Sequence, residues 1–188
     1  RPEEEMVGWF KLPKNIRIKV ANSEAHYPLE SMWSYGVSLK NPFEIMEKSL
    51  GQSIGIVVAR TVKLDDNSLI ENVLGALFQV GLRTDLSIRD RVMIRRFLAD
   101  AVNSKEVLEF SIPNSVFDKV IDPDGKEFFE FNTTMSLWTK NKFVIEPILD
   151  ENADISINNI SGVIGAGNVL ASQLGSVGMH VVEVKAEP

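Results

Sequence analysis

The order of helix and strand patterns along the chain constrains the fold more than any other sequence feature. Capped amphipathic helix patterns gather between residues 41 and 104, and alternating or β-branched stretches dominate on both sides. The patterns do not repeat as strand–helix–strand units, an order that favours the α+β class over a doubly wound parallel sheet. We therefore predict an α+β fold in which a mostly antiparallel sheet packs against a central helical pair.

Length and composition predict a single domain. The chain has 188 residues, 44% of them hydrophobic and 24% charged, which is ordinary for one globular domain. Trp9, Phe10 and Leu12 precede Pro13 and form an apolar hook after an acidic start. We expect a flexible or hooking segment over residues 1–14 and a single globular α+β domain over residues 15–188.

The strand predictions rest on alternation and on β-branched residues. Between residues 15 and 21, Ile16 and Ile18 alternate with Arg17 and Lys19, which predicts a half-buried strand with a basic outer side. Further strands are predicted at 54–62, 107–112, 127–139 and 179–185, with a helical turn within 114–121 and a tight turn at Pro123–Gly125. Residues 142–149 are expected to be the hairpin partner of 127–139, at a sheet edge because Pro147 cannot donate a hydrogen bond.

Capping signals predict three helices. Pro42 and Glu44 after Asn41 indicate a helix start, and Gly51 indicates its end. Two capping boxes, Ser68 with Glu71 and Ser87 with Asp90, begin the central pair. Their apolar stripes are Leu69, Ile70, Val73, Leu74, Leu77 and Phe78, ended by Gly81, and Ile88, Val92, Met93, Phe97, Ala101 and Val102. Residues 22–40 show no clear period.

The inventory of reactive side chains argues against several chemistries. The chain has no cysteine, which excludes disulfides, thiolate metal sites and a cysteine nucleophile. His26 and His180 are its two histidines, and neither has a metal-ligand spacing. No nucleophile elbow is present. We predict no enzymatic activity, no catalytic residues, no metal and no cofactor, although a catalytic site assembled only by folding stays an alternative.

Two loop motifs are similar to ligand-binding loops and depart from them. Val163–Val169 is similar to the phosphate loop of dinucleotide-binding proteins, but Leu170 stands at the third small position and few residues follow. We favour a small-residue helix that packs closely against a sheet. Asp122–Gly125 is similar to a calcium loop, but Val120 and Phe131 stand where acidic ligands are needed, so a turn is predicted.

Charge and aromatic residues supply the candidate contact sites. The net charge of −6 disfavours a protein that coats nucleic acid, and we predict no direct sequence-specific nucleic-acid binding. The candidate basic contacts are Lys11, Lys14, Arg17, Lys19, Arg89, Arg91, Arg95 and Arg96, for which a solvated surface is the plainer interpretation. The candidate self-association or partner contacts are Trp9, Phe10, Trp33, Tyr35, Pro42 and Phe43, for which core packing is the alternative.

Part of the chain resembles the matrix proteins of rhabdoviruses. The matching features run from the Ile16–Val20 strand through Trp33, Tyr35, Pro42-Phe43 and Ile45 to Leu50-Gly51. A looser similarity covers Pro113 to Trp138, where an aromatic-rich strand precedes a polar turn. The acidic net charge and the lack of a Pro-Pro-x-Tyr motif depart from the family, which would suit a plant-infecting member.

This resemblance implies a non-enzymatic virion protein that self-associates and links the nucleocapsid to the inner face of the envelope. The implied partners are copies of itself, the nucleocapsid or other viral proteins, and an anionic membrane surface. The implied location is the virion and the host cytoplasm, peripheral at the membrane. We expect neither secretion nor a transmembrane segment, because no signal pattern begins the sequence and its apolar stretches are short. Another viral structural protein, such as a capsid, tail or movement protein, is the alternative.

Overall fold

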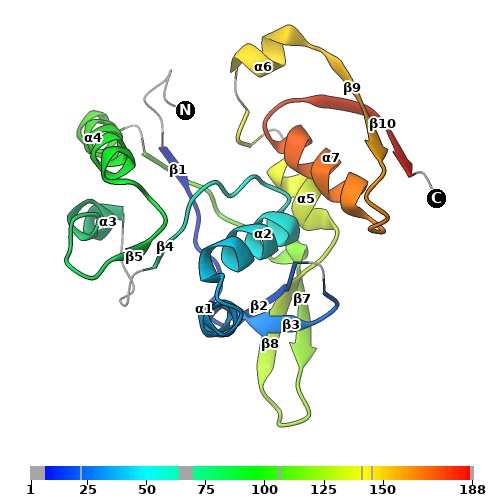
Figure 1. Cartoon of the computed structure of the whole chain (residues 1–188), viewed down its shortest axis with the longest axis horizontal. Coiled ribbons are helices and arrows are strands. Elements are labelled where there is room, and N and C mark those ends of the chain that lie inside the picture. Colours follow the sequence, from blue (N-terminus) through cyan, green and yellow to red (C-terminus); the bar gives the residue numbers. More distant parts are fainter. Residues whose placement is uncertain are drawn as a thin grey trace. The chain divides into compact units, whose positions relative to one another are not determined.

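The computed structural model describes residues 7–21, 23–63, 70–105, 107–140, 142–144 and 146–186, and the chain forms two compact units (Figure 1). Residues 1–12 and 59–112 make the smaller unit, and residues 13–58 and 113–188 make the larger one. Each unit is therefore built from two separate segments of the sequence, which alternate along the chain. The single-domain part of the prediction is not confirmed.

A four-stranded sheet in the order β3-β2-β8-β7 forms the centre of the larger unit. Its strands are β2 (Ile16–Lys19), β3 (His26–Pro28), β7 (Phe117–Ile121) and β8 (Glu127–Phe131). The predicted strand around Ile16 and Ile18 is confirmed, and both side chains are buried. β2 runs antiparallel to β3 and parallel to β8, and β7 and β8 form an antiparallel hairpin. The sheet is therefore mixed.

Helices α1 (Leu29–Ser38) and α2 (Pro42–Ile54) pack on each other and on this sheet (Figure 1). They cross closely because Gly36 has no side chain, and a methyl group there would lie 2.6 Å from the Cα of Pro42. The buried apolar side chains described in this unit are Ile16, Ile18, Val20, Ala21, Met32, Trp33, Ile54, Val116, Met135, Val144 and Ile157. This core fixes α2 against β2.

The C-terminal part of the larger unit is a strand–helix–strand motif. β9 (Asp154–Asn159) and β10 (His180–Ala186) are parallel, and α7 (Ala166–Ser176) connects them. A methyl group on Gly167 would lie 2.7 Å from Cγ1 of Val184, so glycine permits the close approach of α7 to β10. The predicted small-residue helix packed against a sheet is confirmed. Short elements η1 (Asn114–Val116), α5 (Thr134–Thr139) and α6 (Glu146–Glu151) complete this unit.

The described residues of the smaller unit form two short ladders and two helices. β1 (Val7–Trp9) pairs in parallel with β6 (Val107–Glu109), and β4 (Val62–Lys63) pairs antiparallel with β5 (Arg83–Thr84). α3 (Ile70–Ala76) contacts α4 (Ile88–Ser104). The predicted Ser87–Asp90 capping box is confirmed. Ser68 of the other predicted capping box lies outside the described residues.

The structure changes the predicted fold class in two respects. It is a mixture of helices and small sheets, and the ladders β1–β6, β2–β8 and β9–β10 are parallel, so a mostly antiparallel sheet is not confirmed. The helices that cover the four-stranded sheet are α1 and α2, whereas the predicted central pair corresponds to α3 and α4 of the smaller unit. Within the segment expected to be flexible or hooking, Val7–Trp9 forms a strand paired with β6.

For several segments the predicted kind of secondary structure is wrong. Residues 54–62 form no continuous strand, because α2 runs past Gly51 to Ile54 and Gly55 ends it with a φ of 76°. The strand predicted at 127–139 ends at Phe131, and Thr134–Thr139 form the helix α5. The hairpin partner of this strand is β7 and not residues 142–149. Residues within the predicted strand 142–149 start α6. Residues 29–38, which show no clear period, form α1.

Candidate functional site

Helix α4 presents the most coherent charged surface among the predicted contacts. Ser87 caps it, since its Oγ accepts a hydrogen bond from the backbone N–H of Asp90 at 3.1 Å. The Asp90 carboxylate accepts in return from the Ser87 N–H at 3.2 Å and from its hydroxyl at 2.8 Å. These hydrogen bonds, the side-chain one foremost, lower the pKa of Asp90, so the cap is ionised at neutral pH.

One side of α4 exposes apolar side chains. Ile88, Val92 and Met93 are 74%, 52% and 59% exposed, although the sequence pattern placed all three on a buried stripe. That expectation is wrong for them, because the side of α4 that is buried carries Ala101 and these three side chains lie outside it. Apolar periodicity identifies the two sides of a helix, and the neighbouring elements decide which side is covered.

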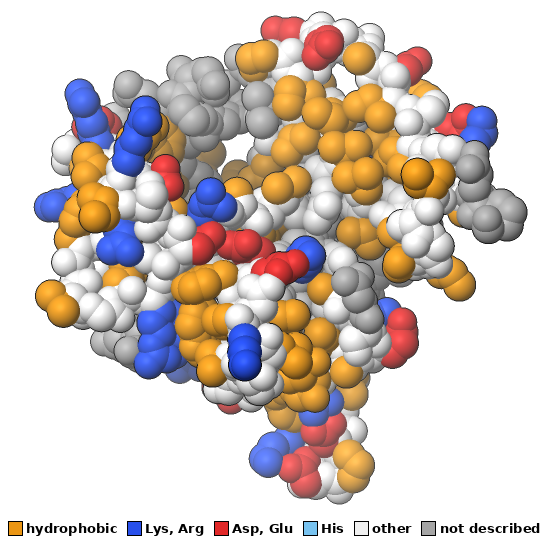
Figure 2. All heavy atoms as spheres, viewed as in Figure 1, with side chains coloured by type: hydrophobic (Ala, Val, Ile, Leu, Met, Phe, Trp, Pro, Cys, Tyr) orange, Lys and Arg blue, Asp and Glu red, His pale blue; other side chains and the backbone are white. Residues whose placement is uncertain are grey.

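Arginines stand among these exposed apolar residues. Ile88, Val92 and Arg96 follow one another at four-residue spacing, and Arg89 and Met93 form the adjacent row. We call these five residues the α4 face. Both of its arginines are exposed and form no ion pair within the described part of the chain. Figure 2 shows basic and hydrophobic side chains together over the region where Figure 1 places α4.

The other two predicted arginines of α4 are engaged within the smaller unit. Arg91 is half-buried and its Nε donates to the carbonyl of Leu86 at 3.3 Å. The guanidinium of Arg95 lies over the ring of Phe78, 5.3 Å from its centroid, a distance that suits a cation–π contact. Arg91 and Arg95 therefore support the fold of the unit, while Arg89 and Arg96 stay exposed, and the charge of Arg89 contributes to the lowered pKa of Asp90.

The first basic cluster is dispersed. Arg17 pairs with Asp122 and lies over the Phe128 ring, 3.9 Å from its centroid, and only 17% of its side chain is exposed. Lys19 donates to both carboxylate oxygens of Glu24 at 2.8 Å. Lys11 and Lys14 are exposed and belong to different units. Of these four residues, Arg17 and Lys19 are thus paired with carboxylates of the larger unit.

The aromatic candidates divide between core and partly covered positions. Trp33 is 8% exposed and packs edge-on against Phe43, with ring centroids 5.1 Å apart. Trp33 therefore belongs to the core and offers little surface to a partner. Tyr35 stacks on Tyr27 at 4.9 Å. Trp9, Phe10 and Pro42 are half-buried, so partial contact with a partner stays a prediction for them.

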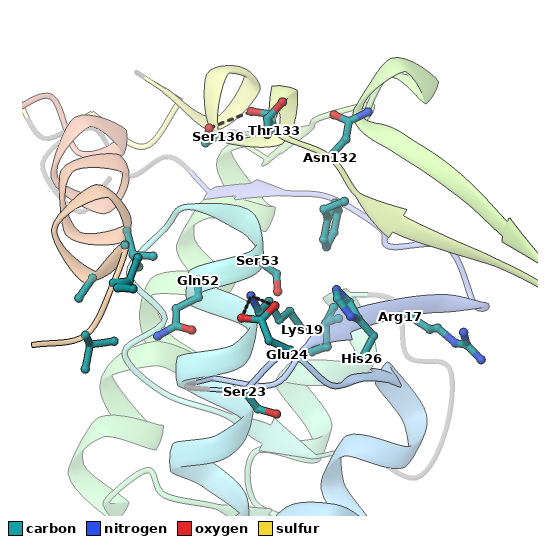
Figure 3. Close-up of a pocket in the computed structure, with 17 residues that line it drawn as sticks. Arg17, Lys19, Ser23, Glu24, His26, Gln52, Ser53, Asn132, Thr133 and Ser136 are labelled. Carbon is teal, nitrogen blue, oxygen red and sulfur yellow. Dashed lines mark hydrogen bonds and ion pairs between the residues drawn. The ribbon is translucent and has the colours of Figure 1, made fainter.

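The larger unit contains an open cleft of about 700 Å³. Its walls come from β2, the segment after it, α2, the start of α5 and the start of α7 (Figure 3). The Lys19–Glu24 ion pair lies near its middle, Gln52 and Ser53 of α2 lie close by, and Arg17 points away from them (Figure 3). Exposed Ile164 and Val163 add an apolar wall. The alternation of β2 gave no signal for this cleft, because its members come from distant segments.

Two features of the cleft have chemical potential. The hydroxyl oxygen of Ser53 is buried and has no hydrogen-bond partner among the described residues. His26, which also lines the cleft, places its Nε2 3.8 Å from Glu130 Oε2. The second histidine, His180, is remote in sequence and places Nδ1 2.7 Å from Asp154 Oδ1 on the surface. Neither pair includes a serine hydroxyl at hydrogen-bond distance, and the described residues contain no group of metal-ligating side chains.

Comparisons with known proteins leave the family open. No family model, no curated protein and no solved structure matches this chain. In the described part of the chain, no helix combines the length and the apolar character needed to cross a bilayer. A function for this protein therefore rests on the surfaces and the cleft themselves.

Proposed function

We propose that this protein is a non-enzymatic structural protein that attaches peripherally to an anionic membrane surface and associates with its own copies. The single observation behind the proposal is the α4 face, where two exposed arginines stand among three exposed apolar side chains. The proposal agrees with what the matrix-protein resemblance implies. A link to a nucleocapsid stays a prediction, and a capsid, tail or movement protein stays the alternative.

The physical argument is that the two kinds of side chain favour the same environment. The free energy of exposed apolar residues on a helix falls when they enter the boundary between headgroups and acyl chains. Arginines next to them are attracted by anionic headgroups, with about 1 kcal/mol for each basic residue near the surface. Helix α4 contains four arginines and two aspartates, so its net charge is positive. One of the aspartates, Asp90, accepts hydrogen bonds from Ser87 in the capping box. A basic amphipathic helix is the pattern expected for peripheral membrane binding.

Vesicle co-sedimentation over a salt series tests the proposal. We expect binding to vesicles that contain phosphatidylserine and little binding to pure phosphatidylcholine vesicles. Binding should fall steeply as salt rises, because exposed charges are screened beyond about 10 Å at 0.1 M salt. No sedimentation with anionic vesicles at low salt would contradict the proposal.

A matched pair of variants assigns the binding to α4. Arg89→Gln with Arg96→Gln should lower the partition coefficient roughly thirty-fold, from about 1 kcal/mol for each charge. Lys119→Gln with Lys126→Gln removes the same charge from the β7–β8 hairpin of the larger unit and should leave binding unchanged. Equal losses in both variants would mean that net charge, and not the α4 face, governs binding.

A further inference from the structure

Strand β10 has an unpaired edge. It pairs with β9 on one side, and the ladder contains only these two strands among the described residues. Six of its seven residues are exposed. Such an edge presents backbone N–H and C=O groups that can extend the sheet with a strand from another chain. A parallel two-stranded ladder is also a small unit that gains from further strands.

The side chains of β10 alternate in a way that defines two faces. Val184 points toward α7, because its Cγ1 is the nearest atom to a methyl group built on Gly167. Its neighbours Glu183 and Lys185 lie on the opposite face, where Lys185 Nζ and Glu183 Oε2 are 3.0 Å apart. Both charged side chains are about half exposed or more. The outer face of β10 therefore carries one acidic and one basic residue on either side of Val184.

We infer that β10 pairs antiparallel with β10 of a second copy of this chain, about a two-fold axis at Val184. In that register Glu183 of each copy lies opposite Lys185 of the other, and the two valines lie opposite each other under the helices. Two-fold symmetry makes both contacts identical, as in an isologous interface. The assembly is a four-stranded sheet in the order β9-β10-β10-β9. The inference rests on the self-association in the proposed function and assigns it a surface.

Charge selects this register over its neighbours. An axis at Glu183 would place two glutamates directly opposite each other, and an axis at Lys185 would place two lysines opposite each other. Like charges in directly opposed cross-strand positions are destabilising, and opposite charges are stabilising. The β-bulge between Val181 and Glu183 ends the regular stretch on the other side, so the paired segment is short. A second copy of the chain therefore carries both charges that are complementary to Glu183 and Lys185.

Charge reversal and mixing test the inference by sedimentation equilibrium. The wild-type chain should dimerise in a concentration-dependent way. Glu183→Lys alone and Lys185→Glu alone should each weaken dimerisation roughly tenfold, since both cross-strand contacts become repulsive. A mixture of these two variants should form a heterodimer as strong as the wild-type dimer, because each contact again joins a lysine to a glutamate. The double variant with both reversals should also dimerise.

The mixing result separates pairing from misfolding, since two misfolded chains would not regain association together. A wild-type chain that stays monomeric at all concentrations overturns the inference, as does a single reversal that leaves dimerisation unchanged. Vesicle binding of the Lys185→Glu variant reports on the proposed membrane attachment separately. Vesicle binding without dimers refutes only the β10 pairing, whereas dimers without vesicle binding refute only the α4 attachment.

Discussion

Two serines on α2 show how the same residue type can have opposite energetic roles. Ser49 is fully buried, and its Oγ accepts a hydrogen bond from the backbone N–H of Ala21 at 3.0 Å. Ser53, one turn later, lines the cleft with a buried hydroxyl that has no partner in the described structure. A buried hydroxyl without a hydrogen-bond partner costs stability.

At Ser53 we predict that replacement by alanine stabilises the larger unit. Ser53→Ala removes an unsatisfied hydroxyl and gains helix propensity, and the free energy of unfolding should rise by about 1 kcal/mol. Urea unfolding followed by circular dichroism measures this change. Ser49→Ala is the matched control and should lower the free energy of unfolding by roughly 1–3 kcal/mol, since it leaves the Ala21 N–H without its acceptor. A loss at both positions would mean that the Ser53 hydroxyl has a partner.

At the scale of elements, glycines decide how closely helices approach their neighbours. Gly36 permits the crossing of α1 over the start of α2, and Gly167 permits α7 to lie on β10. By contrast, a methyl group on Gly175 of α7 would meet no atom within 4 Å. The sequence alone does not distinguish these positions, because each glycine lies within or beside an apolar helix pattern.

The α1–α2 crossing predicts opposite effects for two glycine-to-alanine changes. Gly36→Ala should lower the free energy of unfolding by roughly 1–3 kcal/mol, since the added methyl group would lie 2.6 Å from backbone carbon of Pro42 and the helices would have to separate. Gly175→Ala should raise it by roughly 0.5–1 kcal/mol through helix propensity. Thermal unfolding of both variants beside the wild type checks the signs. Stabilisation by Gly36→Ala would show that the crossing is looser than described.

At the scale of the whole molecule, the two units differ in the size of their cores. The buried apolar residues described in the smaller unit are Ala76, Leu77, Leu86 and Ala101, whereas the larger unit buries large side chains from its sheet and helices. Stability is distributed unevenly in such chains, and segments with few buried apolar contacts open first. The α4 face therefore belongs to the less stable unit.

This difference predicts two separable unfolding transitions. Amide hydrogens of α4 should exchange with solvent faster than those of β2 and α2, as measured by hydrogen–deuterium exchange. Leu77→Ala should destabilise the smaller unit by roughly 2–5 kcal/mol and accelerate exchange in α4. Exchange in β2 should be unchanged by this variant. A uniform acceleration across both units would show that they unfold as one cooperative domain.

Local signals in the sequence predicted local features correctly. The Ser87–Asp90 capping box, the start of α2 at Pro42, the β2 alternation and the turn before β8 were all predictable, because each depends on residues a few positions apart. The candidate site was predicted in part. Four arginines of α4 were identified, but only packing shows that Arg91 and Arg95 are engaged while Arg89 and Arg96 are free of ion pairs in the described chain.

The sequence by itself determined where several helices and strands begin, which chemistries the side chains can support, and that α4 is both basic and amphipathic. Only the tertiary structure decided the rest: the division into two units, the parallel pairing of β9 with β10, the exposure of Ile88 and Val92, and the cleft around Ser53. The physical reason is that burial and strand pairing depend on contacts between distant segments. The spacing of apolar residues predicts that a helix has an apolar and a polar face. Which face is covered depends on elements that come from elsewhere in the chain.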